Sequence, residues 1–255
     1  MEKISAVIIA KNEENNIARC LQSLIGIVDE MLVVDSESTD KTAKLASDLG
    51  AKVIQHPFEG YYQQKNVALD AACYDFVLSL DADEALSPEL QDEILKVKND
   101  PRYDAYVVKR KNNYCGQWIR HGGWYPDKKL RLWDKAKGRW GGGNPHEKVI
   151  MEQPFSVKEL KGDLLHYAYR SEDELLKKME LYADMGATSA FEAGKKISFP
   201  MVLLKTGFKF FRDYILKLGF LDGNVGYTIA KHSAYEKFLK YSNLNKMNKD
   251  KTKVG

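Results

Sequence analysis

Two aspartates at a spacing of two residues could do chemistry together. Asp81 and Asp83 directly follow an apolar run, 76–80, that has the composition of a buried strand. Side chains at positions i and i+2 of an extended segment point the same way, so both carboxylates can converge on one site. Hard carboxylate oxygens suit Mg²⁺ or Mn²⁺, which keep open positions for water and phosphate oxygens. The pair therefore predicts a metal site that holds a diphosphate.

Other polar residues follow other strand-like runs. Asp35 ends the run that begins at Met31, and Asn12 and Glu13 come just after the run that ends at Ala10. An acidic pair alone often only caps a helix. In parallel α/β sheets, however, the strands end at one rim, and ligands bind there. We expect these residues and the aspartate pair to line one site.

The elements that must position these residues alternate between short β-branched runs and helix-like segments. This alternation is typical of βαβ units and a mostly parallel sheet. The patterns predict strands at 5–10, 31–35, 52–56 and 76–80, and helices at 13–24, 39–49, 63–72 and 88–98. Two more strands are expected at 105–111 and 129–133, between loops rich in glycine and aromatic residues. From Ser171 on, the pattern predicts helices alone.

Composition excludes several classes of protein. The chain has 255 residues, of which 29% are charged and 44% hydrophobic, which is ordinary for a globular protein and unlike a disordered or fibrous one. No apolar run approaches the roughly 18 residues of a spanning helix. The N-terminus enters strand-like sequence without the features of a leader, which predicts a cytoplasmic chain. Three cysteines at no metal-binding spacing are expected to be reduced and structural.

The sequence resembles the family 2 glycosyltransferases, enzymes of the GT-A fold that transfer a sugar from a nucleotide donor with inversion. The matching stretches are Val7 to Glu14, Val33 to Asp40, Lys65 with Asn66, and Leu80 to Asp83. The resemblance implies that Asp35 and the loop Ala10 to Glu13 hold the nucleoside and that Lys65 lies near the base. It further implies that Asp83 ligates the metal and that Asp81 lies beside the ribose and diphosphate. Ala10 stands where proline is frequent, and Ser36-Glu37 where Asp-Gly is frequent, which leaves the donor less defined.

An inverting transfer also needs a carboxylate that accepts the proton of the acceptor hydroxyl. Glu147 is the candidate, because it follows a glycine-rich turn well after the metal motif, as the base does in this family; Asp127 is the rival. His166 follows in the order of a third metal ligand used by some GT-A enzymes, although it and His146 could also be buried, hydrogen-bonded histidines. Lys129 and Arg131 alternate on one strand face, and could meet a diphosphate or an anionic acceptor, or simply face solvent.

The basic C-terminal part suggests a second kind of partner. Residues 195–255 carry 13 of the 39 Lys and Arg but 4 of the 36 Asp and Glu, so residues 1–194 carry 26 against 32. A single helix over 199–221 would gather Leu203, Phe210, Phe211, Tyr214, Ile215, Leu218 and Leu221 on one face, and Lys205, Lys209 and Arg212 on the other. This pattern is typical of a helix in an anionic membrane interface, and the alternative is packing on the catalytic domain. A second basic helix is expected over 225–241, and no nucleic-acid-binding module is recognised.

A second set of segments resembles a bacterial subfamily that adds a hexose, typically glucose, to the inner core of lipopolysaccharide. These segments are Trp124 to Trp133, Pro145 to Glu147, His166 and the turn Gly219 to Gly223. The resemblance implies a lipid-linked saccharide acceptor at the cytoplasmic face of the inner membrane, with the enzyme peripheral to it.

These observations together predict a GT-A α/β domain over 1–170, an amphipathic helical region over 171–243 and a basic, mobile tail over 244–255. The expected reaction is transfer of a hexose, from UDP-glucose first of all, to a hydroxyl of a lipid-linked saccharide, with Mg²⁺ or Mn²⁺ as cofactor. A nucleotidyltransferase of similar fold is the alternative enzyme. A membrane-binding module with a decayed site is the alternative without catalysis.

Overall fold

The computed structural model describes residues 1–142 and 147–254, and only the backbone of 251–254. The chain forms two compact units. The first consists of Met1–Lys111 and Asp127–Tyr167, and the second of Asn112–Pro126 and Ala168–Gly255. The sequence pattern suggested a single boundary near residue 170, whereas the excursion 112–126 also joins the helical unit.

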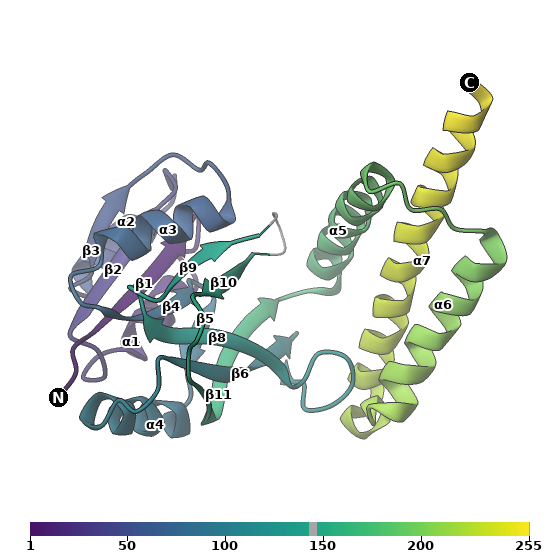
Figure 1. Ribbon diagram of the computed structural model, residues 1–255. Coiled ribbons are helices and arrows are strands. Elements are labelled where there is room, and N and C mark those ends of the chain that lie inside the picture. The colour runs from purple at the N-terminus through teal and green to yellow at the C-terminus, as the bar shows by residue number, and fades with distance from the viewer. Residues whose placement is uncertain (143–146, 255) are drawn as a thin grey trace. The chain divides into compact units, whose positions relative to one another are not determined.

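The sheet of the first unit has the strand order β3-β2-β1-β4-β8-β6-β11-β5, with β7 paired to β6 in the second unit (Figure 1). Four neighbouring strands are parallel: β1 (Ile4–Ala10), β2 (Glu30–Asp35), β3 (Lys52–Gln55) and β4 (Phe76–Asp81). The others are β5 (Glu84–Leu86), β6 (Ala105–Tyr114), β7 (Gln117–Trp118), β8 (Asp127–Asp134) and β11 (Val157–Tyr169), and the pairs β4–β8, β6–β8, β6–β7 and β5–β11 are antiparallel. The fold is thus the α/β architecture expected from the sequence.

Helices cover both faces of this sheet because β1 is apolar on both sides. Ile4, Ala6 and Ile8 pack with α1 (Ile17–Gln22), α2 (Thr42–Asp48) and α4 (Pro88–Asn99). Val7, between them in sequence, points to the other face, against α3 (Tyr61–Ala71) and the hairpin of β9 (Gly138–Gly141) and β10 (Lys148–Met151). Alternate residues of a strand face opposite sides, so an uninterrupted apolar run is what a strand covered on both faces requires.

The second unit consists of α5 (Glu172–Glu192), α6 (Phe199–Phe211), a π-helical turn η1 (Arg212–Leu216), a 3₁₀ turn η2 (Gly219–Asp222) and α7 (Gly223–Val254). In Figure 1, α7 runs beside both α5 and α6, with which it makes most of its contacts. Within the described residues, no helix is both long and apolar enough to span a bilayer.

Two expectations for this unit are wrong. The single helix expected over 199–221 ends at Phe211, continues as the π-helical turn and reverses at Leu218, whose φ is +58°. The segment expected as a separate tail from 244 instead continues α7 without a break to Val254. Packing explains the continuation, since Leu244 is buried against α5 and the Asn245 side chain donates a hydrogen bond to the Ile197 carbonyl.

Candidate active site

The strand ends that carry the predicted polar residues meet at one edge of the sheet. Ala10 on β1 lies opposite Asp35 on β2, and Ile9 lies opposite Asp81 on β4. Since β2 and β4 flank β1, the backbones at Asp35 and Asp81 are about two strand spacings apart, roughly 10 Å. This edge is the carboxyl end of the parallel strands, where the sequence predicted a ligand site.

The loops after β1 and β2 are tied together by side chains. Asp35 is buried and accepts hydrogen bonds from the Ser38 hydroxyl, at 2.5 Å, and the Ser38 N–H, at 2.9 Å. The Asn12 N–H donates to Ser38 Oγ, the Asn12 amide oxygen accepts from the Thr39 N–H, and the Glu13 N–H donates to Thr42 Oγ1. Asn12 has a φ of +55°, which asparagine tolerates better than most residues. The two loops thus form one preorganised polar rim.

Asp81 lies between two cations from different elements. Its Oδ1 is 2.9 Å from Lys65 Nζ, on α3, and its Oδ2 accepts a 2.9 Å hydrogen bond from Arg131 Nη2, on β8. Burial alone would raise the pKa of the Asp81 carboxyl, but the charges of Lys65 and Arg131 outweigh burial and hold this pKa well below its usual range. Asp81 is therefore a fixed negative charge at neutral pH.

Glu84 is a buried carboxylate that the sequence patterns did not single out. Its Oε1 accepts a 2.7 Å hydrogen bond from Arg131 and lies 3.4 Å from Arg110, and its Oε2 accepts one of 3.0 Å from the Asp81 N–H. Burial would lower the pKa of the Arg131 guanidinium, but Glu84 and Asp81 raise it above its usual value. Arg131 is thus buried and ion-paired, which rules out the solvent-facing alternative considered for it. Lys129, on the same strand, is partly exposed and 3.2 Å from Asp127.

Strand β11 brings His166 to the aspartate pair. His166 lies opposite Glu84 in the β5–β11 pairing, the Tyr167 N–H donates to the Asp83 carbonyl, and His166 Nε2 is 3.3 Å from Asp83 Oδ2. Carboxylate oxygen and imidazole nitrogen together suit Mn²⁺, and the carboxylate also suits Mg²⁺. Across 1–142 and 147–250 no three His, Cys, Asp or Glu side chains converge as a metal cage. The pair fits an ion that takes its other ligands from water and phosphate.

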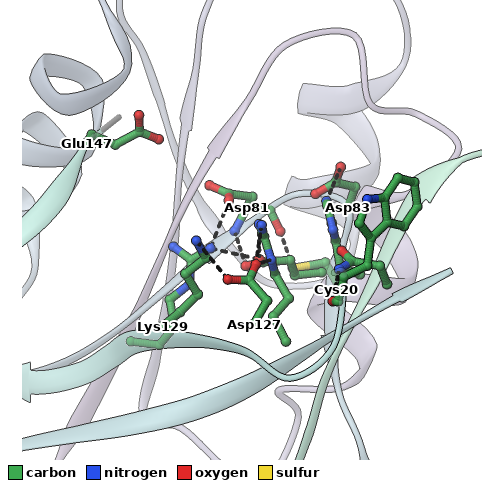
Figure 2. Close-up of polar contacts among 12 residues, drawn as sticks. Cys20, Asp81, Asp83, Asp127, Lys129 and Glu147 are labelled. Carbon is green, nitrogen blue, oxygen red and sulfur yellow. Dashed lines mark hydrogen bonds and ion pairs between the residues drawn. The ribbon is translucent and has the colours of Figure 1, made fainter. Parts of the chain in front are cut away.

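The two candidate bases differ in how their oxygens are engaged. Asp127 Oδ2 accepts hydrogen bonds from Arg110 Nε and Nη2, at 2.9 and 2.7 Å, and its Oδ1 faces Lys129. Among the described residues, Glu147 has a cation only near its Oε1, which is 3.3 Å from Lys65 Nζ. Figure 2 shows Asp127 and Lys129 beside Asp81, and Glu147 on a separate segment. The residues just before Glu147, including His146, lie outside the described part of the chain.

Three buried polar atoms without a partner in the described part of the chain belong to residues that contact Lys65 or Asp81. Glu147 Oε2, Arg131 Nε and Trp140 Nε1 are buried, and none has a hydrogen-bond partner within the described residues. The Trp140 ring lies 4.4 Å from Lys65 Nζ. Orphaned buried polar atoms are rare in native structures and often mark functional sites. Two of these three atoms are donors, which suit phosphate oxygens, and the third is an acceptor, which suits a hydroxyl.

The charges of this cluster leave one negative charge in excess. Its carboxylates are Asp81, Asp83, Glu84, Asp127 and Glu147, and its cations are Lys65, Arg110, Lys129 and Arg131. A divalent cation reverses this balance and makes the site attractive to a diphosphate.

Cys20 Sγ lies 3.8 Å from the Asp81 carbonyl, and burial together with the nearby carboxylates raises the pKa of its thiol well above the usual value. Cys20 is therefore a protonated packing residue, as expected.

Arg19 makes a contact beside the candidate site that the sequence did not indicate. Its guanidinium carbon lies 3.7 Å from the centre of the Tyr167 ring, next to His166 in sequence. No spacing signal links α1 to β11, so only the fold reveals this contact.

Comparison with known proteins identifies the family of the chain. Residues 5–156 match the model of Glycosyl transferase family 2. An uncharacterized glycosyltransferase of Rickettsia typhi is 34% identical over 257 residues, covering 97% of this chain and 88% of the relative. The lipopolysaccharide core biosynthesis glycosyltransferase LpsC of Rhizobium meliloti is 29% identical over 245 residues, covering 92% and 89%. The S. aureus TarS 1-349 structure in complex with UDP-GlcNAc, at 16% identity, aligns over 98% of this chain and 92% of that one with a TM-score of 0.50, which bears on the fold alone. The chain therefore belongs to glycosyl transferase family 2.

Proposed function

We propose that this glycosyltransferase moves a hexose, with inversion, from a UDP-sugar to a hydroxyl of a lipid-linked saccharide. UDP-glucose is the first donor to test, and lipopolysaccharide core is the acceptor class. The observation that carries the proposal is the convergence of Asp81, Asp83, His166 and Lys65 on one rim, with the unpartnered atoms of Glu147, Arg131 and Trp140 close by. The name of the R. meliloti relative supports the acceptor class.

The donor side of the site binds the nucleotide diphosphate. Asp83 and His166 would hold Mg²⁺ or Mn²⁺, which neutralises charge on the leaving diphosphate. The rim of Ala10, Asn12, Glu13 and Asp35 would receive the nucleoside. For this, the Asp35 carboxylate must exchange part of its contact with Ser38 for the ligand, since both oxygens bind Ser38 here.

Lys65 and Arg131 supply the remaining positive charge at the diphosphate. Both are buried, at 3% exposure, and are held in place by Asp81, so they need little reorganisation when charge develops on the leaving group. Fixed charges in a site with little water are the main source of such stabilisation.

The acceptor side uses Glu147 as general base. The acceptor oxygen attacks the anomeric carbon, the bond from that carbon to the diphosphate oxygen breaks, and the hydroxyl proton passes to Glu147. Asp127 is less suited, because each of its oxygens already faces a cation. The lipid-linked acceptor would be presented at an anionic membrane surface, with the enzyme peripheral on its cytoplasmic side.

Two substitutions separate binding from turnover. Glu147→Gln is expected to leave the UDP-glucose-induced rise in Tm unchanged and to lower UDP release during transfer about 100-fold or more. Asp83→Ala is expected to abolish the Mn²⁺-dependent part of that rise. The control is Glu152→Gln, an exposed carboxylate five residues further on.

Each contrary outcome removes a defined part of the proposal. Wild-type turnover in Glu147→Gln would eliminate this residue as the base and direct attention to Asp127→Asn. If no nucleotide sugar stabilises the wild-type protein with or without Mn²⁺, the non-catalytic membrane module takes precedence. The family assignment already argues against a nucleotidyltransferase.

A further inference from the structure

One side of α6 is apolar and exposed. Leu204, Phe208 and Phe211 follow each other at intervals of four and three residues, which places them on one stripe of α6, and the exposed Ile215 extends this stripe into the π-helical turn. Val202 and Asp213, on the opposite side, are buried. The stripe differs from the face expected of a single long helix. Phe210 and Tyr214, which belonged to that face, instead stack on each other and make edge-to-face contacts with Tyr227 of α7.

The stripe continues into the turn where the chain reverses toward α7. Leu216, Leu218, Phe220 and Leu221 lie here, and with the four stripe residues they form what we call the α6–η2 edge. All eight side chains are between 42 and 65% exposed. Exposed apolar side chains that gather along one segment commonly mark an interaction site.

Hydrogen bonds and close packing fix the conformation of this turn, so its apolar residues are exposed in an ordered structure and not in a frayed helix end. The Asp222 carboxylate accepts hydrogen bonds from the N–H groups of Arg120 and His121 and pairs with the His121 ring at 2.9 Å. Gly219 is buried, and a Cβ there would come within 2.6 Å of the Asp213 carbonyl oxygen. Asp213 is itself buried and is paired with Lys209 and Arg212. Polar anchors on the inner side therefore hold leucine and phenylalanine outward.

The basic residues around the α6–η2 edge indicate that its binding partner is anionic. Lys205 and Lys217 are exposed within the same segment, and the described residues place no carboxylate in an ion pair with either, although Lys205 Nζ lies 5.0 Å from the centre of the Tyr241 ring of α7. Residues 195–255 as a whole carry 13 basic against 4 acidic residues. A second copy of the chain would bring two such basic surfaces together. An anionic bilayer instead complements both the apolar edge and the lysines.

We propose that the α6–η2 edge inserts into the interfacial layer of an anionic membrane. Its leucine and phenylalanine side chains enter the boundary between headgroups and acyl chains, and Lys205 and Lys217 contact the lipid phosphates. The inference deepens the proposed function and rests on it for its purpose, because a lipid-linked acceptor lies at that surface.

Vesicle binding by the full chain tests the proposal. Phosphatidylcholine vesicles with phosphatidylglycerol should pellet the protein, and vesicles of phosphatidylcholine alone should do so much less. Leu204→Asp and Phe208→Asp should each weaken binding about tenfold or more, since each removes one large side chain from the bilayer. Lys205→Glu with Lys217→Glu should weaken it mainly at low salt. The matched control is Leu181→Asp, because Leu181 is 57% exposed on α5, outside the edge.

Three further measurements keep the outcomes distinct. Circular dichroism and Tm show whether each variant is folded. Sedimentation without lipid shows whether the edge joins two copies of the chain. The proposal would be overturned if the wild-type protein is a dimer that does not bind vesicles and Phe208→Asp converts this dimer to a monomer. UDP release with a lipid-free acceptor saccharide should be equal in wild type and edge variants. If the wild-type protein transfers sugar but does not bind vesicles, this inference is wrong and the proposed function stands. If it binds vesicles but transfers no sugar, the proposed function is wrong and this inference stands.

Discussion

At the scale of single residues, the candidate site depends on carboxylates that hold cations in place. Glu84 shows this most clearly, because its side chain is fully buried and contacts both Arg131 and Arg110. It also receives the N–H of Asp81, so it links the charge network to the backbone of the aspartate pair. We assign it a positioning role.

Replacing Glu84 by glutamine should therefore destabilise the fold. Glutamine keeps the shape but leaves two guanidiniums without their shared counter-charge, and breaking a buried ion pair costs about 3–5 kcal/mol. The free energy of unfolding from urea titration measures this loss. Glu59→Gln, in an exposed loop position, is the control. A loss no larger than that of Glu59→Gln would show that Glu84 does not hold the network.

At the scale of elements, β11 determines whether His166 reaches Asp83. The strand passes close to the start of α4 at Gly162, whose φ is +83°. A Cβ at this position would overlap the backbone at Leu90 and Glu89. The glycine therefore lets the strand lie against the helix, and the strand in turn carries His166 to the rim.

Gly162→Ala and Gly50→Ala form a matched pair that tests this packing. Gly50 has the same φ of +83°, but a Cβ there would meet nothing within 4 Å. Gly50→Ala should cost only the left-handed conformation, about 1 kcal/mol. Gly162→Ala should lower the free energy of unfolding by the same amount plus about 1–3 kcal/mol for the steric overlap. It should also weaken the Mn²⁺-dependent stabilisation of the protein by the donor. Equal losses of unfolding free energy in both variants would contradict a close approach of β11 to α4.

At the scale of the whole molecule, donor binding and membrane binding are proposed for different units, and this separation can be measured. All residues assigned to donor binding, metal and base lie in the first unit, and the proposed membrane edge lies in the second. Hydrogen exchange with UDP-glucose and Mn²⁺ should therefore protect amides at 10–14, 35–40, 81–84 and 164–167. The second unit should change far less.

Removal of the metal should affect the amide protection of the two sets of segments differently. Without Mn²⁺, protection at 81–84 and 164–167 should be lost first, because these segments carry Asp83 and His166. Protection at 35–40 should persist at higher donor concentration, since that rim contacts the nucleoside in the proposal. Equal protection across 168–250 would instead show that donor binding is coupled to the helical unit.

The parallel half of the sheet and the polar residues at its rim were predictable from local sequence patterns. Apolar β-branched runs covered on both faces produce a signal that needs no knowledge of the partner strand, and Asp35, Asp81 and Asp83 stand where those runs end. The antiparallel half was harder to predict. Strand β11 has only scattered buried positions among charged residues, and the short β5, β9 and β10 carry no periodic pattern of useful length.

The pairing of cations with carboxylates and the exposed side of α6 depend on contacts between distant segments, which local patterns do not reveal. Lys65, Glu84 and Arg131 come from three elements, and their contacts depend on strand order, which local spacing does not encode. The helical wheel for 199–221 assumed 100° per residue throughout. The π-helical turn at Arg212–Leu216 and the reversal at Leu218 break that periodicity, and the partly buried Phe210 and Tyr214 contact Tyr227 of α7. Ring contacts among Phe210, Tyr214 and Tyr227, rather than the local periodicity, accompany this arrangement.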